Sequence, residues 1–350
     1  MTTEKLVIVG AGFAGLCAAF HGRASGLDPL IIDCAEGPGG AWARMNPDML
    51  CLSPRKRDLL PDTTMPGGAA AIATAGAVLA QLRAFADKHA FRALYRSKVT
   101  VCARDGDEFV LRIGDSTLRT STLVAATGVA GAPRGLRASD PFEGNIIPTL
   151  GLHQQMEDVG DKVLVVGAGN SGAEAVRLLR TTGRQVTLSS RAPLRSRRPP
   201  MDGLLGELRW QLSGTPTQWL PRSLRCQKSS VPQDEALEKA AADGSIHVVG
   251  EAVSFTAAGA ICRTDVGFQE VEVDTIICAT GYRRDLDWLD SLLPRDPGGT
   301  PRHRAGLIPE TPKLALLGLD CQRTRRSGFL RGMNDDAHVI VRRLVGHGHA

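Results

Sequence analysis

The sequence is poor in aromatic residues, and this scarcity limits the kinds of ligand it can bind. Only two Tyr and four Trp occur among its 350 residues. That is too few for the aromatic-studded basic face typical of proteins that bind single-stranded nucleic acid. The net charge of +5 is also local, because Arg191, Arg195, Arg197 and Arg198 lie in one short run. We therefore expect a small anionic ligand and no nucleic acid, with a solvated basic loop as the alternative.

No two of the eight cysteines form a C-x-x-C pair. Cys17, Cys34, Cys102 and Cys278 lie in or beside strand and helix patterns, where buried thiols are common. The spacing predicts a reducing cytoplasm, no disulfide framework and no zinc site.

Long uninterrupted apolar runs are missing as well. The apolar stretch 5–20 follows Glu4 and contains three glycines, so it is a poor signal peptide. Residues 65–82 contain Pro, Gly and Thr and are too weakly apolar for a membrane span. We expect no membrane partner, and the length favours about two domains.

A strand–helix–strand pattern occurs twice. The first unit is predicted at 5–10, 12–25 and 29–33, and the second at 162–167, 170–182 and 185–190. Helices are also predicted over 78–90 and 332–346, a small antiparallel meander over 98–128, and a linker over 129–161. The sequence therefore predicts an α/β protein with two Rossmann-like dinucleotide-binding domains.

The first unit contains the loop Gly10-Ala-Gly12-Phe-Ala-Gly15. Its glycines allow a tight turn, close approach of a pyrophosphate to the backbone, and close packing of helix on strand. Asp33 ends the next strand, where a carboxylate accepts ribose hydroxyls. An ordinary glycine-rich turn is the alternative.

The second unit contains Gly167-Ala-Gly169-Asn-Ser-Gly172, but no acid ends its second strand. Arg191 follows instead, which suits a ribose 2′-phosphate and predicts NADPH. A solvated Arg191 is the alternative. Because two adjacent dinucleotides allow hydride transfer between them, the expected pair is a nicotinamide donor and a flavin acceptor, FAD.

Several further segments give the chain a family resemblance. In order, they are GPGGAWAR with Gly39, Gly40 and Trp42; LCLSPRKRDLLP; the two ATG strands in VAATG and ICATGYR; and GFLRGMNDDAHVI. Together they resemble the flavin-containing monooxygenases, a family of two-dinucleotide-domain flavoproteins. The resemblance implies a discontinuous FAD domain, 1–150 plus 282–350, with an NADPH domain, 151–281, inserted. It also implies that the start of the last helix faces the flavin.

One family motif departs from its pattern. The resemblance calls for F-x-G-x-x-x-H between the glycine loops, and this chain has Phe142 and Gly144 but Pro148 in place of the histidine. His153 follows five residues later. The fold is unaffected by this change, but the oxygenation chemistry is left open.

The candidate catalytic residues are Arg55, Trp42 and Arg331. The candidate cofactor-binding residues are Gly10, Gly12, Phe13, Ala14, Gly15, Asp33, Cys34, Gly40, Ala41, Trp42, Val101, Ala126, Thr127, Gly128, Gly167, Gly169, Asn170, Ser171, Gly172, Arg191, Ala279, Thr280, Gly281, Gly332 and Met333.

The expected function is that of an NADPH-dependent monooxygenase. It would transfer one oxygen atom of O₂ to a heteroatom or carbonyl of a small organic substrate through a flavin hydroperoxide. The alternatives are a thiol-dependent reductase, which the lack of C-x-x-C disfavours, an oxidoreductase or oxidase without oxygen transfer, and a nucleotide sensor without turnover. The oligomeric state is left open, with a homodimer as one option.

Overall fold

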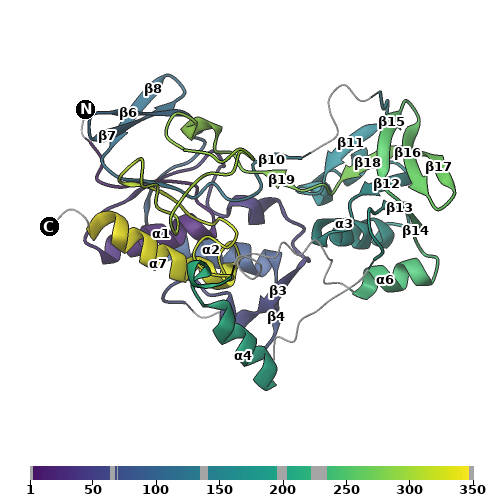
Figure 1. The fold of residues 1–350 in the computed structure, drawn as a ribbon, viewed down its shortest axis with the longest axis horizontal. Helices are drawn as coiled ribbons and strands as arrows, with labels where there is room; N and C mark the ends of the chain where they lie inside the picture. Colours follow the sequence, from purple (N-terminus) through teal and green to yellow (C-terminus); the bar gives the residue numbers. More distant parts are fainter. Residues whose placement is uncertain are drawn as a thin grey trace.

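The computed structural model describes residues 3–63, 68, 70–134, 141–194, 203–221 and 235–346. These residues form two lobes, each built on a five-stranded parallel sheet (Figure 1). The predicted fold class is confirmed. The basic residues Arg195, Arg197 and Arg198 lie outside the described residues.

The sheet of the first lobe has the strand order β20-β9-β1-β2-β5. Its strands are short and buried at the centre because they are almost continuously apolar, as parallel strands covered on both faces are. They are β1 (Val7–Val9), β2 (Leu30–Ile32), β5 (Arg92–Leu94), β9 (Leu123–Ala125) and β20 (Leu314–Leu316).

The first lobe also contains three long helices. They are α1 (Phe13–Ala24), α2 (Ala75–His89) and α7 (Leu330–Gly346). Helix α7 lies beside α1, and its apolar side chains join the same core cluster (Figure 1). The C-terminal segment therefore packs on the N-terminal glycine-loop unit. Helix α7 begins two residues before the predicted start.

The sheet of the second lobe has the order β11-β18-β12-β13-β14. Its strands are β11 (Asn145–Pro148), β12 (Lys162–Val166), β13 (Gln185–Ser189), β14 (His247–Val249) and β18 (Thr275–Cys278). Two helices belong to it, α3 (Asn170–Thr181) and α6 (Glu235–Ala242). The segment expected as a linker over 129–161 thus contributes β11 to a sheet.

Each lobe carries a three-stranded antiparallel meander at the same point of its topology. The first consists of β6 (Val99–Asp105), β7 (Glu108–Ile113) and β8 (Ser116–Thr120). The second consists of β15 (Ala252–Thr256), β16 (Gly259–Thr264) and β17 (Gly267–Glu272). Each meander leads back to the central strand that neighbours the glycine-loop strand, β9 or β18.

The chain passes between the lobes at two strands, which lie side by side. Strands β10 (Ala132–Pro133) and β19 (Tyr282–Arg283) pair antiparallel directly after the two ATG segments. Short 3-10 helices complete the structure: η1 (Gly40–Arg44), η2 (Arg55–Arg57), η3 (Leu152–Gln154), η4 (Met156–Asp158), η5 (Thr217–Trp219) and η6 (Asp287–Leu289).

One helix leaves its own lobe. Helix α4 (Gly203–Ser213) lies in sequence between β13 and α6, yet it packs near the pair β3 (Leu50–Pro54) and β4 (Ile72–Thr74) of the first lobe (Figure 1). Trp210 on α4 lies beneath the Arg57 guanidinium, 4.6 Å from it, and beneath that of Arg326, at 3.5 Å. These stacked cations tie α4 to the first lobe.

The cysteines differ in one respect from expectation. Six described cysteines are free, but Cys321 is disulfide-bonded, whereas the cysteine spacing predicts no disulfide framework. No described helix has both the length and the apolar character to cross a membrane. Among the described residues, no cluster of three or more His, Cys, Asp or Glu side chains could hold a metal ion.

Candidate functional site

The first glycine loop joins β1 to α1 and has no room for side chains. Gly10 has φ +114°, and a Cβ there would lie 2.4 Å from the Ala126 carbonyl oxygen. A Cβ on Gly15 would lie 1.8 Å from the Gly10 oxygen. Both contacts are with backbone and cannot be relieved by side-chain rotation. The loop therefore needs glycine at both positions, and it places the predicted residues Ala126 and Thr127 against Gly10.

The second glycine of this loop, Gly12, faces another glycine-containing segment. A Cβ on Gly40 would lie 3.0 Å from the Gly12 Cα, and the Gly39 N–H donates to the Ala11 carbonyl at 3.0 Å. Backbone from two segments thus meets at the start of α1. That helix is capped by Gly12 with no side-chain hydrogen bond. Such a helix start can present its N–H groups to a phosphate.

Asp33 lies at the end of β2, directly beside this helix start. Its Oδ2 accepts from the Ala11 N–H at 2.5 Å, and its Oδ1 accepts from the Ala35 N–H at 2.7 Å. A carboxylate has about four acceptor positions, so two remain for other donors. The residues around Gly12 and Asp33 therefore fit the pyrophosphate and ribose of a dinucleotide.

The second glycine loop repeats this geometry between β12 and α3. Gly167 has φ +112°, and a Cβ there would lie 2.6 Å from the Ala279 oxygen. A Cβ on Gly172 would lie 1.9 Å from the Gly167 oxygen. Gly169 caps α3 with no side-chain hydrogen bond and has nothing within 4 Å of an added Cβ. The start of α3 is therefore open for an approaching ligand.

Helix α2, which does not follow a glycine loop, is capped differently. Helix α2 is capped by Thr74, whose Oγ1 accepts from the Ala77 N–H at 3.2 Å. The two helices that follow glycine loops lack such a side-chain cap. This difference is what a phosphate-binding helix start requires.

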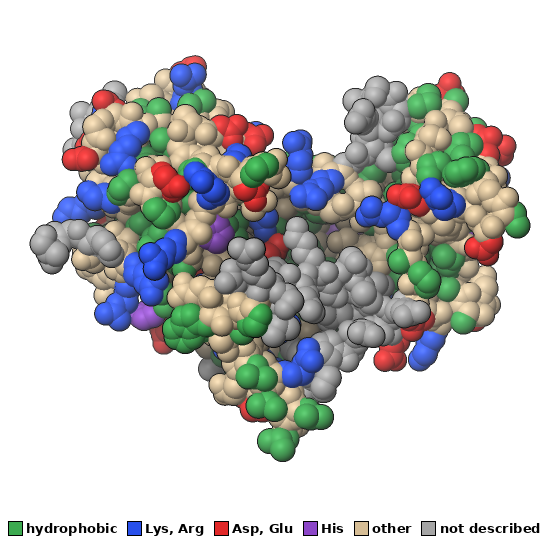
Figure 2. Space-filling model, viewed as in Figure 1, with side chains coloured by type: hydrophobic (Ala, Val, Ile, Leu, Met, Phe, Trp, Pro, Cys, Tyr) green, Lys and Arg blue, Asp and Glu red, His purple; other side chains and the backbone are tan. Residues whose placement is uncertain are grey.

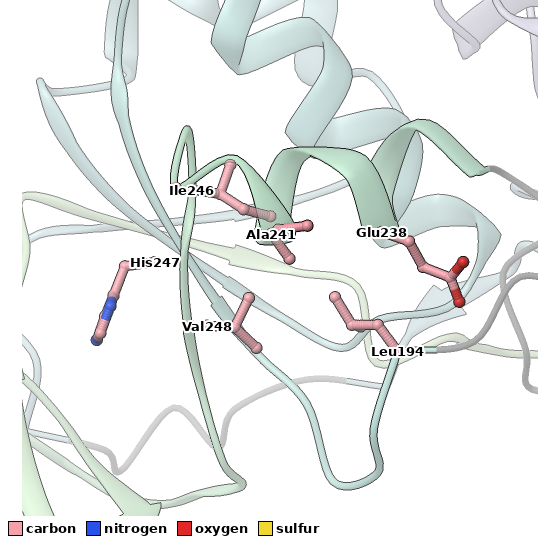
Figure 3. Close-up of a pocket in the computed structure, with 8 residues that line it drawn as sticks. Leu194, Glu238, Ala241, Ile246, His247 and Val248 are labelled. Carbon is pink, nitrogen blue, oxygen red and sulfur yellow. The ribbon is translucent and has the colours of Figure 1, made fainter.

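Arg191 follows β13 by two residues and is exposed. No described acidic residue forms an ion pair with it. Next to this segment lies a cavity of about 770 Å³ at the outer edge of the second sheet. Leu194, Ala241 and Val248 line it from a loop, a helix and a strand (Figure 3). All of its lining residues belong to the second lobe, and none of them belongs to the glycine loop.

The two ATG segments meet at the junction of the lobes. The Thr127 hydroxyl donates to the Asp285 carbonyl at 3.1 Å, and the Arg134 N–H donates to the Gly281 carbonyl at 2.7 Å. Gly128 and Gly281 have φ +76° and +91°, which favours glycine at each turn. The remaining predicted residues of this group, Ala279 and Thr280, directly follow β18.

Tyr282 fixes the segment that follows Pro148. Its hydroxyl accepts from the Leu150 N–H at 2.7 Å and lies 3.1 Å from the Thr149 hydroxyl. Pro148 itself ends β11 and pairs with Cys278 of β18. His153 lies on η3, and its Nδ1 is buried without a described hydrogen-bond partner. Tyr282 was quoted within the ATGYR motif but given no role by the sequence reasoning.

The start of α7 reaches the first glycine loop. A Cβ on Gly318 would lie 3.6 Å from the Ala14 Cβ and 3.9 Å from the Met333 Cε. Gly332 is needed because a Cβ there would lie 2.4 Å from the Arg326 oxygen. The structure thus brings Ala14 and Met333 into one region. Val101, by contrast, lies half-exposed on the first meander.

A buried polar chain joins α7 to β3. Arg331 Nη1 donates to the Ser53 hydroxyl at 3.2 Å, and that hydroxyl donates to Asp58 Oδ1 at 2.8 Å. Burial raises the pKa of Asp58 to about 6, although Ser53, Arg331 and Arg57 oppose the rise. Burial likewise lowers the pKa of Arg331. Asp58 was missed from sequence, although a single acid within PRKRD is a usable signal.

The other candidates lie near this chain or beside the glycine loop. Arg55 begins η2, three residues from Asp58, and Trp42 lies on η1 against the first core cluster. Cys34 lies next to Asp33 and is exposed as a residue. Partial burial of its sulfur atom is the main cause of the raised pKa of the thiol. Their roles are still predictions.

These features define the class of protein as a two-dinucleotide-domain flavoprotein, a flavin-dependent oxidoreductase with FAD and NAD(P) as the cofactors of its class. The chain belongs to the pyridine nucleotide-disulphide oxidoreductase family, whose pattern matches residues 7–203, more than half of its length.

Relatives and solved structures are similar over nearly the whole chain. An uncharacterized oxidoreductase CzcO of Bacillus subtilis is 24% identical, covering 97% of this chain and 99% of that protein. An indole-3-pyruvate monooxygenase YUCCA1 of Oryza sativa is 27% identical, covering 81% of this chain and 78% of that protein. A flavin monooxygenase mutant from Stenotrophomonas maltophilia has the same fold, with a TM-score of 0.79 at 23% identity and 99% coverage of both chains.

Proposed function

We propose that the chain is an FAD- and NADPH-dependent monooxygenase that inserts one oxygen atom of O₂ into a small organic substrate. The observation that carries this proposal is the pair of matched glycine loops, one beside an acid and one beside an arginine. The likeness in fold to flavin monooxygenases supports it.

In the first lobe, Gly12 and the uncapped start of α1 would hold the FAD pyrophosphate, and Asp33 would accept hydrogen bonds from the ribose. The start of α7 would favour negative charge on the flavin ring. When bound, the flavin would supply the redox chemistry that activates O₂. Arg331, held by Ser53 beside Asp58, would keep a fixed positive charge near this helix start.

In the second lobe, Gly169 and the start of α3 would receive the NADPH pyrophosphate. Arg191 would donate to the 2′-phosphate, which a carboxylate at this position would repel. Tyr282 would hold the segment after Pro148 at the junction, where the two cofactors must meet. Arg55 and Trp42 would border the substrate.

Thiol–disulfide exchange at the buried free thiols is less well supported. Burial raises the pKa of the Cys51 and Cys102 thiols to about 12 and that of Cys262 to about 11. Protonated thiols are poor nucleophiles. An NADPH-linked oxidoreductase without oxygen transfer is the second candidate, and Pro148 favours it because proline has no N–H and no ionisable ring with which to bind the coenzyme.

The test is to supply NADPH and isotopically labelled O₂ to the FAD-loaded protein with a panel of amines, sulfides and ketones. A monooxygenase places the label in an organic product, with one NADPH consumed for each label. Consumption of NADPH with label only in peroxide or water, across the panel, would favour the second candidate instead.

A further inference from the structure

Two histidine side chains meet where α1 and α7 lie side by side (Figure 1). His21 comes from the last turn of α1, and His338 comes from the middle of α7. Their Nδ1 atoms are 3.4 Å apart, and their ring centroids are 4.9 Å apart at an interplanar angle of 68°. We name these two side chains the histidine pair. Neither residue belongs to a glycine loop or to the candidate catalytic residues, so the proposed reaction does not explain the pair.

Asn334 determines which ring nitrogen of His21 keeps a lone pair. It lies four residues before His338 on α7, so the two side chains project from the same face of that helix. Its Oδ1 is 2.8 Å from His21 Nε2. Because an amide oxygen can only accept, Nε2 carries the proton and donates, which leaves the lone pair of the neutral ring on Nδ1. Metal-binding histidines are oriented in the same way, by donating their other N–H to an oxygen.

The spacing of the histidine pair fits a shared metal ion better than a direct hydrogen bond. The separation of 3.4 Å between the two Nδ1 atoms is long for a hydrogen bond, for which about 2.7–3.2 Å is usual. Zn²⁺ binds imidazole nitrogens at about 2.0–2.1 Å in tetrahedral geometry, and two such nitrogens lie about 3.3–3.4 Å apart. The observed separation is therefore the one that a tetrahedral ion between the rings requires.

Protonation, local charge and exposure also suit a cation at this place. Burial is the main cause that lowers the pKa of His21, so its ring is neutral and able to bind a metal near neutral pH. The exposed carboxylate of Asp335 acts on the same ring, and its negative charge favours a bound cation. His338 is exposed, so water reaches the pair. On the face drawn in Figure 2, Lys and Arg side chains of the first lobe lie among Asp and Glu side chains, so local ligands rather than a uniformly acidic surface select the place.

We propose that the histidine pair binds one zinc ion, with His21 Nδ1 and His338 Nδ1 as its protein ligands. Structural and catalytic zinc sites have four or three protein ligands, so here water completes the coordination shell and the ion is exchangeable. The pair is smaller than the clusters of three or more side chains that the described residues lack, and it contains no cysteine. Because its ligands come from two helices, the ion links α1 to α7 and stabilises the folded chain. The site is independent of the reaction proposed above.

The experiment is calorimetric titration of the full-length protein with zinc chloride near neutral pH, after a chelator has removed bound metal. We expect one zinc ion per chain. Asn334→Ala should weaken binding by about tenfold, because His21 loses the oxygen that orients it. His21→Ala and His338→Ala should each weaken it by at least about tenfold, because each removes one of the two ligands. Binding should also fall below about pH 6, where the imidazoles become protonated.

Two matched controls separate the pair from other histidines. His247→Ala removes an exposed histidine of β14 in the second lobe, and His347→Ala/His349→Ala removes the two histidines at the end of the sequence. Both proteins should bind zinc as the wild type does. Zinc should raise the melting temperature of the wild type and of both controls, but not that of His338→Ala, because the ion stabilises only a folded state that offers both ligands.

The negative outcomes are equally specific. Wild-type protein that binds no zinc would overturn the proposal and leave the pair as a hydrogen-bonded contact. Binding by His338→Ala that equals that of the wild type would overturn it too, as would binding that disappears in His347→Ala/His349→Ala. These measurements do not involve NADPH or oxygen, so the proposed function and the zinc site can fail separately.

Discussion

The two lobes share the backbone geometry of their glycine loops and differ in the charged residue beside each loop. In each, a glycine-loop strand lies between an ATG strand and the strand that carries the specificity residue. Gly10 and Gly167 approach Ala126 and Ala279 in the same way, to within 0.2 Å. Beyond the loop the lobes diverge, because Asp33 is almost buried with two N–H donors while Arg191 is exposed. We assign the shared geometry to the pyrophosphate of each proposed cofactor and the differing residue to its ribose.

The largest expected effects come from adding a methyl group to one loop at a time. Gly15→Ala and Gly172→Ala each force a Cβ into backbone less than 2 Å away. We expect a loss of stability on the order of 3 kcal/mol in either lobe. Gly15→Ala should also abolish FAD retention, whereas Gly172→Ala should retain FAD and lose NADPH binding. The flavin absorbance of purified protein and its thermal unfolding measure both outcomes.

Gly169→Ala is the matched control, because nothing lies within 4 Å of its added Cβ. It should leave the melting temperature unchanged and weaken NADPH alone. A melting temperature lowered as much as by Gly172→Ala would break the distinction between packing and ligand-facing glycines.

The second effect belongs to the first lobe only and depends on pH. Because the folded-state pKa of Asp58 is raised to about 6, folding favours its protonated form. Stability from this residue is therefore present below its ordinary pKa and is lost as pH rises toward 6. The loss amounts to about 3 kcal/mol at most. Asp58→Asn should remove this slope between pH 4 and 6 in chemical denaturation, and Asp62→Asn, at an exposed site, should not. An unchanged slope in Asp58→Asn would show that the carboxyl is already ionised.

The third effect belongs to the second lobe. Arg191→Ala should weaken NADPH binding by roughly 1.5–3 kcal/mol, the value of a charge-assisted hydrogen bond. Binding of NADH should change little, because it has no 2′-phosphate. Titration of both coenzymes against the wild type, with the exposed Arg180→Ala as control, measures the selectivity. Equal losses for the two coenzymes would mean that Arg191 does not contact the phosphate.

The smallest effect lies at the junction. Pro148 can neither donate a hydrogen bond from its backbone nor relay a proton, so we expect part of the O₂ consumed to leave as hydrogen peroxide. Pro148→His should lower the peroxide formed per NADPH, provided that Tyr282 still holds the next two residues. A wild type that forms little peroxide would indicate that another group replaces the family histidine.

Much of this architecture is predictable because it depends on local patterns. The short apolar strands, the glycine spacing and the positions of Asp33 and Arg191 can all be read along the chain, and the elements of the two strand–helix–strand units begin and end within a few residues of expectation. The place of α4 could not be predicted, because it depends on Arg57 and Arg326 converging on Trp210 from distant segments. The buried group of Ser53, Asp58 and Arg331 was missed for the same reason, since residues 278 positions apart meet only in the folded chain.

The most direct test of the proposed division of labour between the lobes is rapid mixing of the FAD-loaded protein with NADPH without oxygen. The flavin absorbance should bleach with NADPH, and at equal concentration NADH should bleach it more slowly. Arg191→Ala should remove most of that difference. A flavin that NADPH fails to bleach, or that both coenzymes reduce at the same rate in the wild type, would contradict the assignment of an NADPH site to the second lobe.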